Sequence, residues 1–103
     1  MMILISHRGN INGKLPNMEN RPEYIMDALK KGFDCECDVW MIGNKWFLGH
    51  DEPQYEISSD FLSHKGLWIH AKNYEALGEL INSFHHVNFF SHDKDPYTIT
   101  SKG

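Results

Sequence analysis

Residues 33–53 read FDCECDVWMIGNKWFLGHDEP, and this stretch decides the fold class because it contains two strand patterns joined by a turn. Apolar and polar side chains alternate over Phe33–Trp40, as they do in a strand with two different faces. A second strand pattern, Lys45–His50, follows the turn residues Met41-Ile42-Gly43-Asn44. We therefore expect these two strands to pair as a hairpin.

Further strand patterns lie on both sides of this stretch. Each is short, apolar or β-branched, and bounded by Gly, Asn, Asp or Pro. They cover Ile3–His7, Leu67–Lys72 and Val87–His92. About five strands are therefore expected in the chain.

Helical patterns lie between most of these strands. Asn20-Arg21-Pro22-Glu23 predicts the capped start of a helix that ends at Gly32. Asn73 predicts the cap of a second helix, and a shorter one is expected over Ser59–Lys65. Strands that alternate with helices predict an α/β fold, in which helices cover a largely parallel sheet.

Size and composition predict one soluble domain. The chain has 103 residues, of which 41% are hydrophobic and 13% aromatic, enough for a core. Its net charge is −4 and its basic residues cluster no further than Lys30-Lys31, which excludes the usual footprint of a nucleic-acid partner. The opening MMILISHRG has too few apolar residues for a signal peptide or a membrane span, so we expect a cytoplasmic protein.

The two cysteines, Cys35 and Cys37, lie two residues apart on one expected strand. Their Cα atoms would be nearly 7 Å apart, at the limit of disulfide geometry, given a rise of about 3.3 Å per residue. We expect reduced thiols buried against a helix layer, rather than a metal pair.

Polar residues end four of the expected strands on one face each, because alternate side chains of a strand share a face. These residues are His7, Glu36, Asp38, His50, His70 and Lys72. In a parallel α/β barrel the carboxyl ends of the strands form the mouth where active sites lie. Acidic residues are disfavoured in strands, so the carboxylates are expected to face such a site.

A simpler interpretation exists for each of these residues taken alone. A histidine at a strand end is more often a solvated terminus than a catalyst, and Glu36 and Asp38 could face solvent on an edge strand. Four strands that end in the same way favour the functional interpretation.

Four motifs carry a resemblance to a known family: His7-Arg8-Gly9 after a strand, Glu19-Asn20 before a helix, Glu36-x-Asp38, and His50-Asp51. As an ordered set they resemble the glycerophosphodiester phosphodiesterases, within the wider group of phosphatidylinositol phospholipase C-like phosphodiesterases. The resemblance covers residues 3–51 and, more loosely, 67–72.

The resemblance implies a TIM (β/α)8 barrel that hydrolyses phosphodiesters with one divalent cation, Mg²⁺ or Ca²⁺. His7 and His50 would be the general acid/base pair, and Arg8 would contact the phosphate. Glu36 and Asp38 would be metal ligands. In the family one histidine deprotonates a substrate hydroxyl, the other protonates the departing alcohol, and a cyclic phosphate is then hydrolysed.

Two further residues have open roles. Glu19 would either join the metal site or provide the charge that precedes the Asn20 cap. The family pattern Glu-x-Lys is here His70-Ala71-Lys72, so Lys72 fits a phosphate contact and His70 replaces the third carboxylate. An imidazole ligand shifts metal preference toward Mn²⁺ or Zn²⁺. Alternatively, the third carboxylate comes from elsewhere in the chain.

Length is the other departure from the family. A closed (β/α)8 barrel needs roughly 200 residues or more. We expect residues 1–103 to be an incomplete phosphodiesterase barrel domain, the N-terminal part of a TIM barrel. Such a half barrel leaves open edges, so self-association is a further expectation.

The leading functional hypothesis is therefore metal-dependent hydrolysis of small glycerophosphodiester-like substrates. One alternative is a catalytically silent protein that binds phosphorylated ligands. Another is a phospholipase or sphingomyelinase D-type enzyme that acts on membrane lipids.

Overall fold

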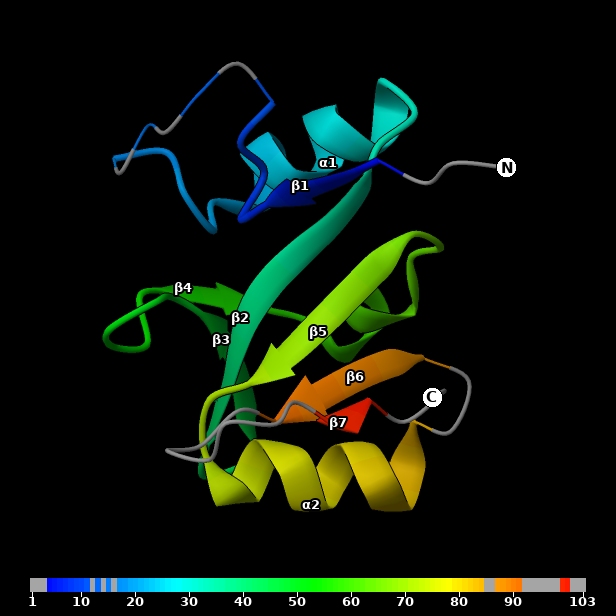
Figure 1. Cartoon of the computed structure of the whole chain (residues 1–103). Helices are drawn as coiled ribbons and strands as arrows, with labels where there is room; N and C mark the ends of the chain where they lie inside the picture. The colour runs from blue at the N-terminus through cyan, green and yellow to red at the C-terminus, as the bar shows by residue number, and fades with distance from the viewer. Residues whose placement is uncertain are drawn as a thin grey trace.

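The computed structural model describes residues 4–11, 13, 15, 17–84, 87–91 and 99–100. A mixed seven-stranded sheet forms its centre, and its two α-helices and one 3₁₀-helix pack beside it (Figure 1). In chain order the elements are β1 (Ile5–His7), α1 (Pro22–Lys30), β2 (Asp34–Ile42), β3 (Lys45–Leu48), β4 (Tyr55–Ile57), η1 (Ser59–Ser63), β5 (Leu67–Ala71), α2 (Tyr74–Ser83), β6 (Asn88–Ser91) and β7 (Ile99–Thr100).

The sheet combines parallel and antiparallel pairs. Strands β1 and β2, β2 and β5, and β5 and β6 are parallel. Strands β2 and β3, β3 and β4, and β6 and β7 are antiparallel. The expected α/β class and the β2–β3 hairpin are confirmed. Over the described residues the sheet is mixed rather than largely parallel, and it is not closed into a barrel.

Strand β2 is the central element of the sheet (Figure 1). Its first residues pair with β1, where Ile5 aligns with Asp34, and its last residues pair with β3, where Leu48 aligns with Val39. Strand β5 pairs with residues 35–39 of β2, which overlap both of these segments, so it lies along the opposite edge and β1 and β3 share one edge of β2. The ends of β1 and β3 therefore meet beside Cys37 and Asp38.

One face of the sheet is covered by the helices. Alternate residues of β2, which are Cys35, Cys37 and Val39, are buried in a single apolar cluster with side chains of β5 and both helices. The cluster also includes Ile25 of α1 and Leu80 of α2. Both cysteines are free and buried, which confirms the expected reduced thiols.

The two α-helices begin with different kinds of N-cap residue. Asn73 caps α2 as predicted, because its side-chain oxygen accepts a hydrogen bond from the backbone N–H of Ala76 at 3.0 Å. The predicted cap of α1 is wrong: its N-cap residue is Arg21, without a side-chain cap. Asn20 has a left-handed backbone (φ 65°) and a different role.

Some expected elements differ from the observed ones. The short helix predicted over Ser59–Lys65 is a 3₁₀-helix, η1, and β4 was not predicted. The predicted strand over Val87–His92 is observed as Asn88–Ser91, while His92 lies outside the described residues, as does Ile3 at the start of the first strand. Within the described residues, no helix is long and apolar enough to span a membrane.

Candidate functional site

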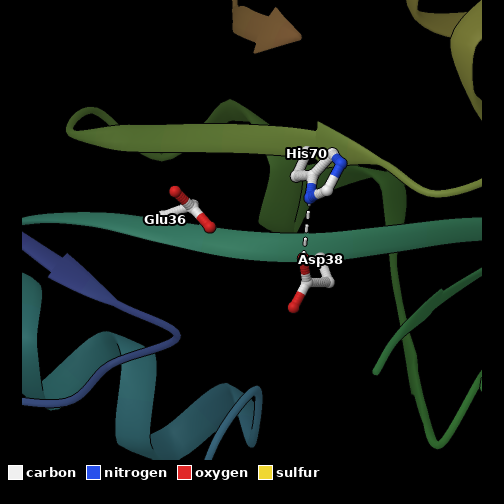
Figure 2. Close-up of side chains that lie close together, drawn as sticks. All are labelled: Glu36, Asp38 and His70. Atoms are coloured by element: carbon white, nitrogen blue, oxygen red, sulfur yellow. Dashed lines mark hydrogen bonds and ion pairs between the residues drawn. The ribbon is translucent and has the colours of Figure 1, made fainter. Parts of the chain in front are cut away.

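The second face of β2 carries the carboxylates. In the register of the sheet, His7 on β1 aligns with Glu36, and His70 on β5 aligns with Asp38. Aligned residues of neighbouring strands point to the same face. Two histidines predicted as site residues are therefore beside the two carboxylates, as Figure 2 shows for His70 and Asp38.

The junction of β1 and β3 brings two more predicted residues to the same place. The backbone N–H of Arg8 donates to the carbonyl of Glu36 at 2.8 Å, and that of Gly49 donates to the carbonyl of Asp38 at 3.1 Å. Arg8 and His50 thus follow directly from strand ends that are both fixed to β2.

Asp38 is the fully buried centre of the site. Its Oδ1 lies 3.0 Å from Nδ1 of His70. Its Oδ2 accepts a hydrogen bond from Nδ2 of Asn20 at 2.9 Å and lies 3.0 Å from Nε of Arg8 and 3.4 Å from Nδ1 of His50. A buried carboxylate is tolerated only when it is paired and hydrogen-bonded, and Asp38 meets both conditions.

Asn20 is a site residue for which the sequence predicted only the role of a helix cap, although it also belongs to the Glu19-Asn20 motif. Besides donating to the Asp38 carboxylate, it accepts a hydrogen bond through Oδ1 from the backbone N–H of Asp38 at 2.9 Å. It is 1% exposed. Asparagine tolerates the left-handed region better than most residues, so this position suits its side chain. Asn20 therefore fixes both the backbone and the carboxylate of Asp38.

The surroundings of Asp38 lower its pKa from 3.8 to about 2. Burial alone would raise the pKa, but hydrogen bonds from His70 and Asn20, together with the charge of Arg8, outweigh burial. The carboxylate is therefore ionised over the whole ordinary pH range, as a metal ligand or a partner of a cationic group must be.

A pH dependence of stability follows. Because the folded-state pKa is depressed, the contribution of Asp38 is present above about pH 4 and is lost as the pH falls toward 2, a loss of about 2 kcal/mol in the free energy of unfolding. Urea unfolding of chelator-treated protein at several pH values measures it. The advantage of wild type over Asp38→Asn should shrink across this interval; an advantage that stays constant would contradict the assignment.

Three side chains form a group that could hold a metal ion. One ligand atom from each of Glu36, Asp38 and His70 lies within 4.8 Å of the other two. Ligands that share one ion at about 2.0–2.6 Å lie up to roughly 5 Å apart, so these donors fit a divalent cation. Oε1 of Glu36 is also 3.0 Å from Nε2 of His7, and the ring of His70 stacks on Phe90 at 4.9 Å.

The remaining predicted residues lie around this group. Glu19 is buried, and its carboxylate accepts hydrogen bonds from Arg8 at 3.1 Å and from Asn10 at 2.8 Å, so it is not one of the three grouped ligands. Lys72 follows β5 directly, and its backbone N–H donates to the carbonyl of Val39 at 2.8 Å.

An open pocket of about 470 Å³ adjoins the site. Its lining consists of His7, Arg8, Asn10, Gly13, Glu19 and His50. It therefore includes the two predicted catalytic histidines, the predicted phosphate contact Arg8 and the buried carboxylate of Glu19. The pocket is large enough for a small polar ligand. A ligand in it would contact both histidines.

Gly49 positions His50 through a close backbone approach. A Cβ atom at Gly49 would overlap the backbone carbonyl oxygen of Glu52, which cannot move as a side chain could. We expect Gly49→Ala to lower the free energy of unfolding by about 2 kcal/mol, since overpacking costs about 1–3 kcal/mol. Thermal unfolding measures this. Gly78→Ala, where a Cβ meets nothing within 4 Å, is the control and should not destabilise the chain.

Comparisons with known protein families, with curated proteins and with solved structures find no match to this chain.

Proposed function

We propose that the protein is a metal-dependent phosphodiesterase that acts on glycerophosphodiester-like substrates. One observation supports this most: His7, Arg8 and His50 lie around the same β2 carboxylates that, with His70, could hold a divalent cation. The residues come from three strands and two loops.

The chemistry assigned to the chain is acid–base catalysis at a phosphate. His7 and His50 line one pocket, and imidazole can both accept and supply a proton near neutral pH. Arg8 and Lys72 are the proposed cationic contacts of the phosphate. When bound, the cation would neutralise charge on the phosphoryl oxygens. Glu36, Asp38 and His70 are its proposed ligands.

The arrangement of the sheet also supports a barrel-type phosphodiesterase. Parallel pairing runs from β1 to β2, from β2 to β5 and from β5 to β6. Helix α1 connects the first of these pairs, and α2 connects the last. His7 ends β1 and His70 lies near the end of β5, at the carboxyl side where barrel enzymes carry their sites. We propose that this sheet is the N-terminal part of a TIM barrel whose β3–β4 hairpin is an addition.

The experiment is hydrolysis of a set of soluble glycerophosphodiesters by the chelator-treated chain, before and after Mg²⁺, Ca²⁺, Mn²⁺ or Zn²⁺ is restored. We expect activity only with metal, and greater activity with Mn²⁺ or Zn²⁺ than with Ca²⁺, because His70 supplies a nitrogen ligand. His64→Gln, a change of an exposed histidine outside the site, should retain full activity. Activity that survives chelation would remove the carboxylates from the mechanism.

A catalytically silent phosphate-binding protein is the second candidate. It is favoured by the saturation of Asp38, whose two oxygens already contact His70, Asn20, Arg8 and His50. A protein of this kind would bind glycerophosphodiesters but would not hydrolyse them, whichever of the four metal ions is restored. Cleavage of liposomal lipids without cleavage of soluble diesters would instead indicate a membrane-lipid substrate.

A further inference from the structure

The guanidinium of Arg8 contacts three different site residues, one at each nitrogen. Nη1 donates to Oε1 of Glu19 at 3.1 Å, Nε lies 3.0 Å from Oδ2 of Asp38, and Nη2 lies 3.2 Å from Nε2 of His50. The side chain is only 12% exposed. The two terminal nitrogens therefore hold the guanidinium between Glu19 and His50, while Nε is close to Asp38 without a hydrogen bond among the described residues.

The contact with His50 determines which ring nitrogen carries the proton. A guanidinium has five N–H donors and no acceptor, and it stays charged. Nε2 of His50 must therefore be the acceptor, which leaves the proton on Nδ1. That nitrogen lies 3.4 Å from Oδ2 of Asp38 but forms no hydrogen bond among the described residues, and Nε2 also lies 3.6 Å from Oδ1 of the exposed Asp51.

The backbone of Arg8 is held as firmly as its side chain. Its φ of 57° lies in the left-handed region, which costs energy for a residue with a side chain. Its N–H donates to the carbonyl of Glu36 at 2.8 Å, and its carbonyl accepts from the N–H of Asn20 at 3.1 Å. A strained conformation that neighbouring strands fix in this way is typical of a functional position.

We propose that Arg8 is a positioning residue that fixes the orientation of the His50 ring and its Nδ1–H tautomer through the contact from Nη2 to Nε2. The inference rests on the proposed function and deepens it, since it says how one member of the acid/base pair is oriented. The role is additional to a phosphate contact, because the three contacts leave other N–H groups on the two terminal nitrogens.

The first test is nitrogen-15 NMR of the imidazole rings in the chelator-treated chain, recorded over a series of pH values up to one at which the neutral ring is observed. The signals of His50 are assigned by their absence in His50→Gln. We expect a protonated Nδ1 and an unprotonated Nε2. A protonated Nε2 would overturn the proposal. Because the spectrum needs no turnover, it is independent of whether the chain is an enzyme.

The second test removes the guanidinium. Arg8→Met deletes the contact to Nε2, so we expect the Nδ1–H pattern of His50 to be lost in favour of a mixture of tautomers. Arg21→Met is the control, because the Arg21 side chain is 41% exposed and contacts Glu23 and Tyr55 outside the site. An unchanged pattern in Arg8→Met, or the same change in Arg21→Met, would contradict the proposal.

A third measurement on wild type does not depend on whether Arg8→Met folds. The chain contains two arginines, Arg8 and Arg21. A guanidinium whose two terminal nitrogens are both held rotates slowly, so Arg8 should show separate Nη1 and Nη2 signals at a temperature where those of Arg21 are averaged. Averaged signals for both arginines would overturn the positioning role, even if every variant unfolded.

Discussion

Asp38→Asn is expected to lower the free energy of unfolding by about 3 kcal/mol and to abolish binding of a divalent cation. The substitution keeps the shape of the side chain but removes its charge, so that the nearly buried Arg8 keeps Glu19 but loses one of its two acidic partners, at 3.0 Å. Removing one member of a buried ion pair costs about 3–5 kcal/mol. Urea unfolding of the chelator-treated chain measures the stability term, and calorimetric titration with Mn²⁺ measures metal binding.

The control for this variant is Asp27→Asn. Asp27 forms a helix-surface ion pair with Lys31 at 3.0 Å, and both side chains are more than half exposed. Exposed pairs of this kind contribute about 0–1 kcal/mol. If Asp38→Asn were no more destabilising than this control, or if it still bound Mn²⁺, the central place of Asp38 in the site would be wrong.

His7→Gln and His50→Gln are each expected to lower kcat by about 10²–10⁴-fold in the metal-loaded chain, the usual contribution of a general acid or base. The side chains of His7 and His50 are 56% and 43% exposed, so neither substitution opens a core cavity. Stability should therefore change little while activity is lost. Hydrolysis of a soluble glycerophosphodiester, measured at saturating substrate, tests this.

The matched comparison is His64→Gln, which changes a histidine beside η1 whose ring contacts Phe61 rather than the site. It should retain the wild-type kcat. Full activity in either His7→Gln or His50→Gln would show that the affected imidazole is not part of a two-histidine mechanism. A loss that appears only in KM would assign it to substrate binding.

The strands of the site could be predicted because strand parity is a local property. Alternation over residues 33–40 correctly separates Cys35 and Cys37, which face the helices, from Glu36 and Asp38, which face the site. The turn predicted over Met41-Ile42-Gly43-Asn44 is confirmed at Gly43 and Asn44, which are typical turn residues, whereas Met41 and Ile42 belong to β2.

The alternation of side chains within one strand could not predict which face of the next strand lies on the same side of the sheet. Trp46 and Leu48 align with Met41 and Val39, so they lie on the helix side of the sheet, where Trp46 packs against Phe84. His50 reaches the site only because β3 ends at Leu48 and the chain turns at Gly49. Register depends on the turn and on packing, neither of which a single-strand pattern contains.

The roles of Asn20 and Arg8 also could not be predicted from their neighbours. Both residues have positive φ angles, and no residue preference near them requires this. Asn20 followed by Pro22 fits a helix start, yet a buried carboxylate on β2 uses the amide instead. Local helix signals were outweighed by the need to satisfy a buried charge.

The shared edge of β2 has a consequence for how the chain tolerates insertions and deletions. His7 and His50 are both placed relative to β2, by the pairs His7 with Glu36 and Leu48 with Val39. The number of β2 residues between Glu36 and Val39 therefore sets the distance between the two imidazoles, and the lengths of the loops do not. Loops can lengthen without altering it, whereas one residue added between Glu36 and Val39 would move the histidines apart by a strand step of about 3.3 Å.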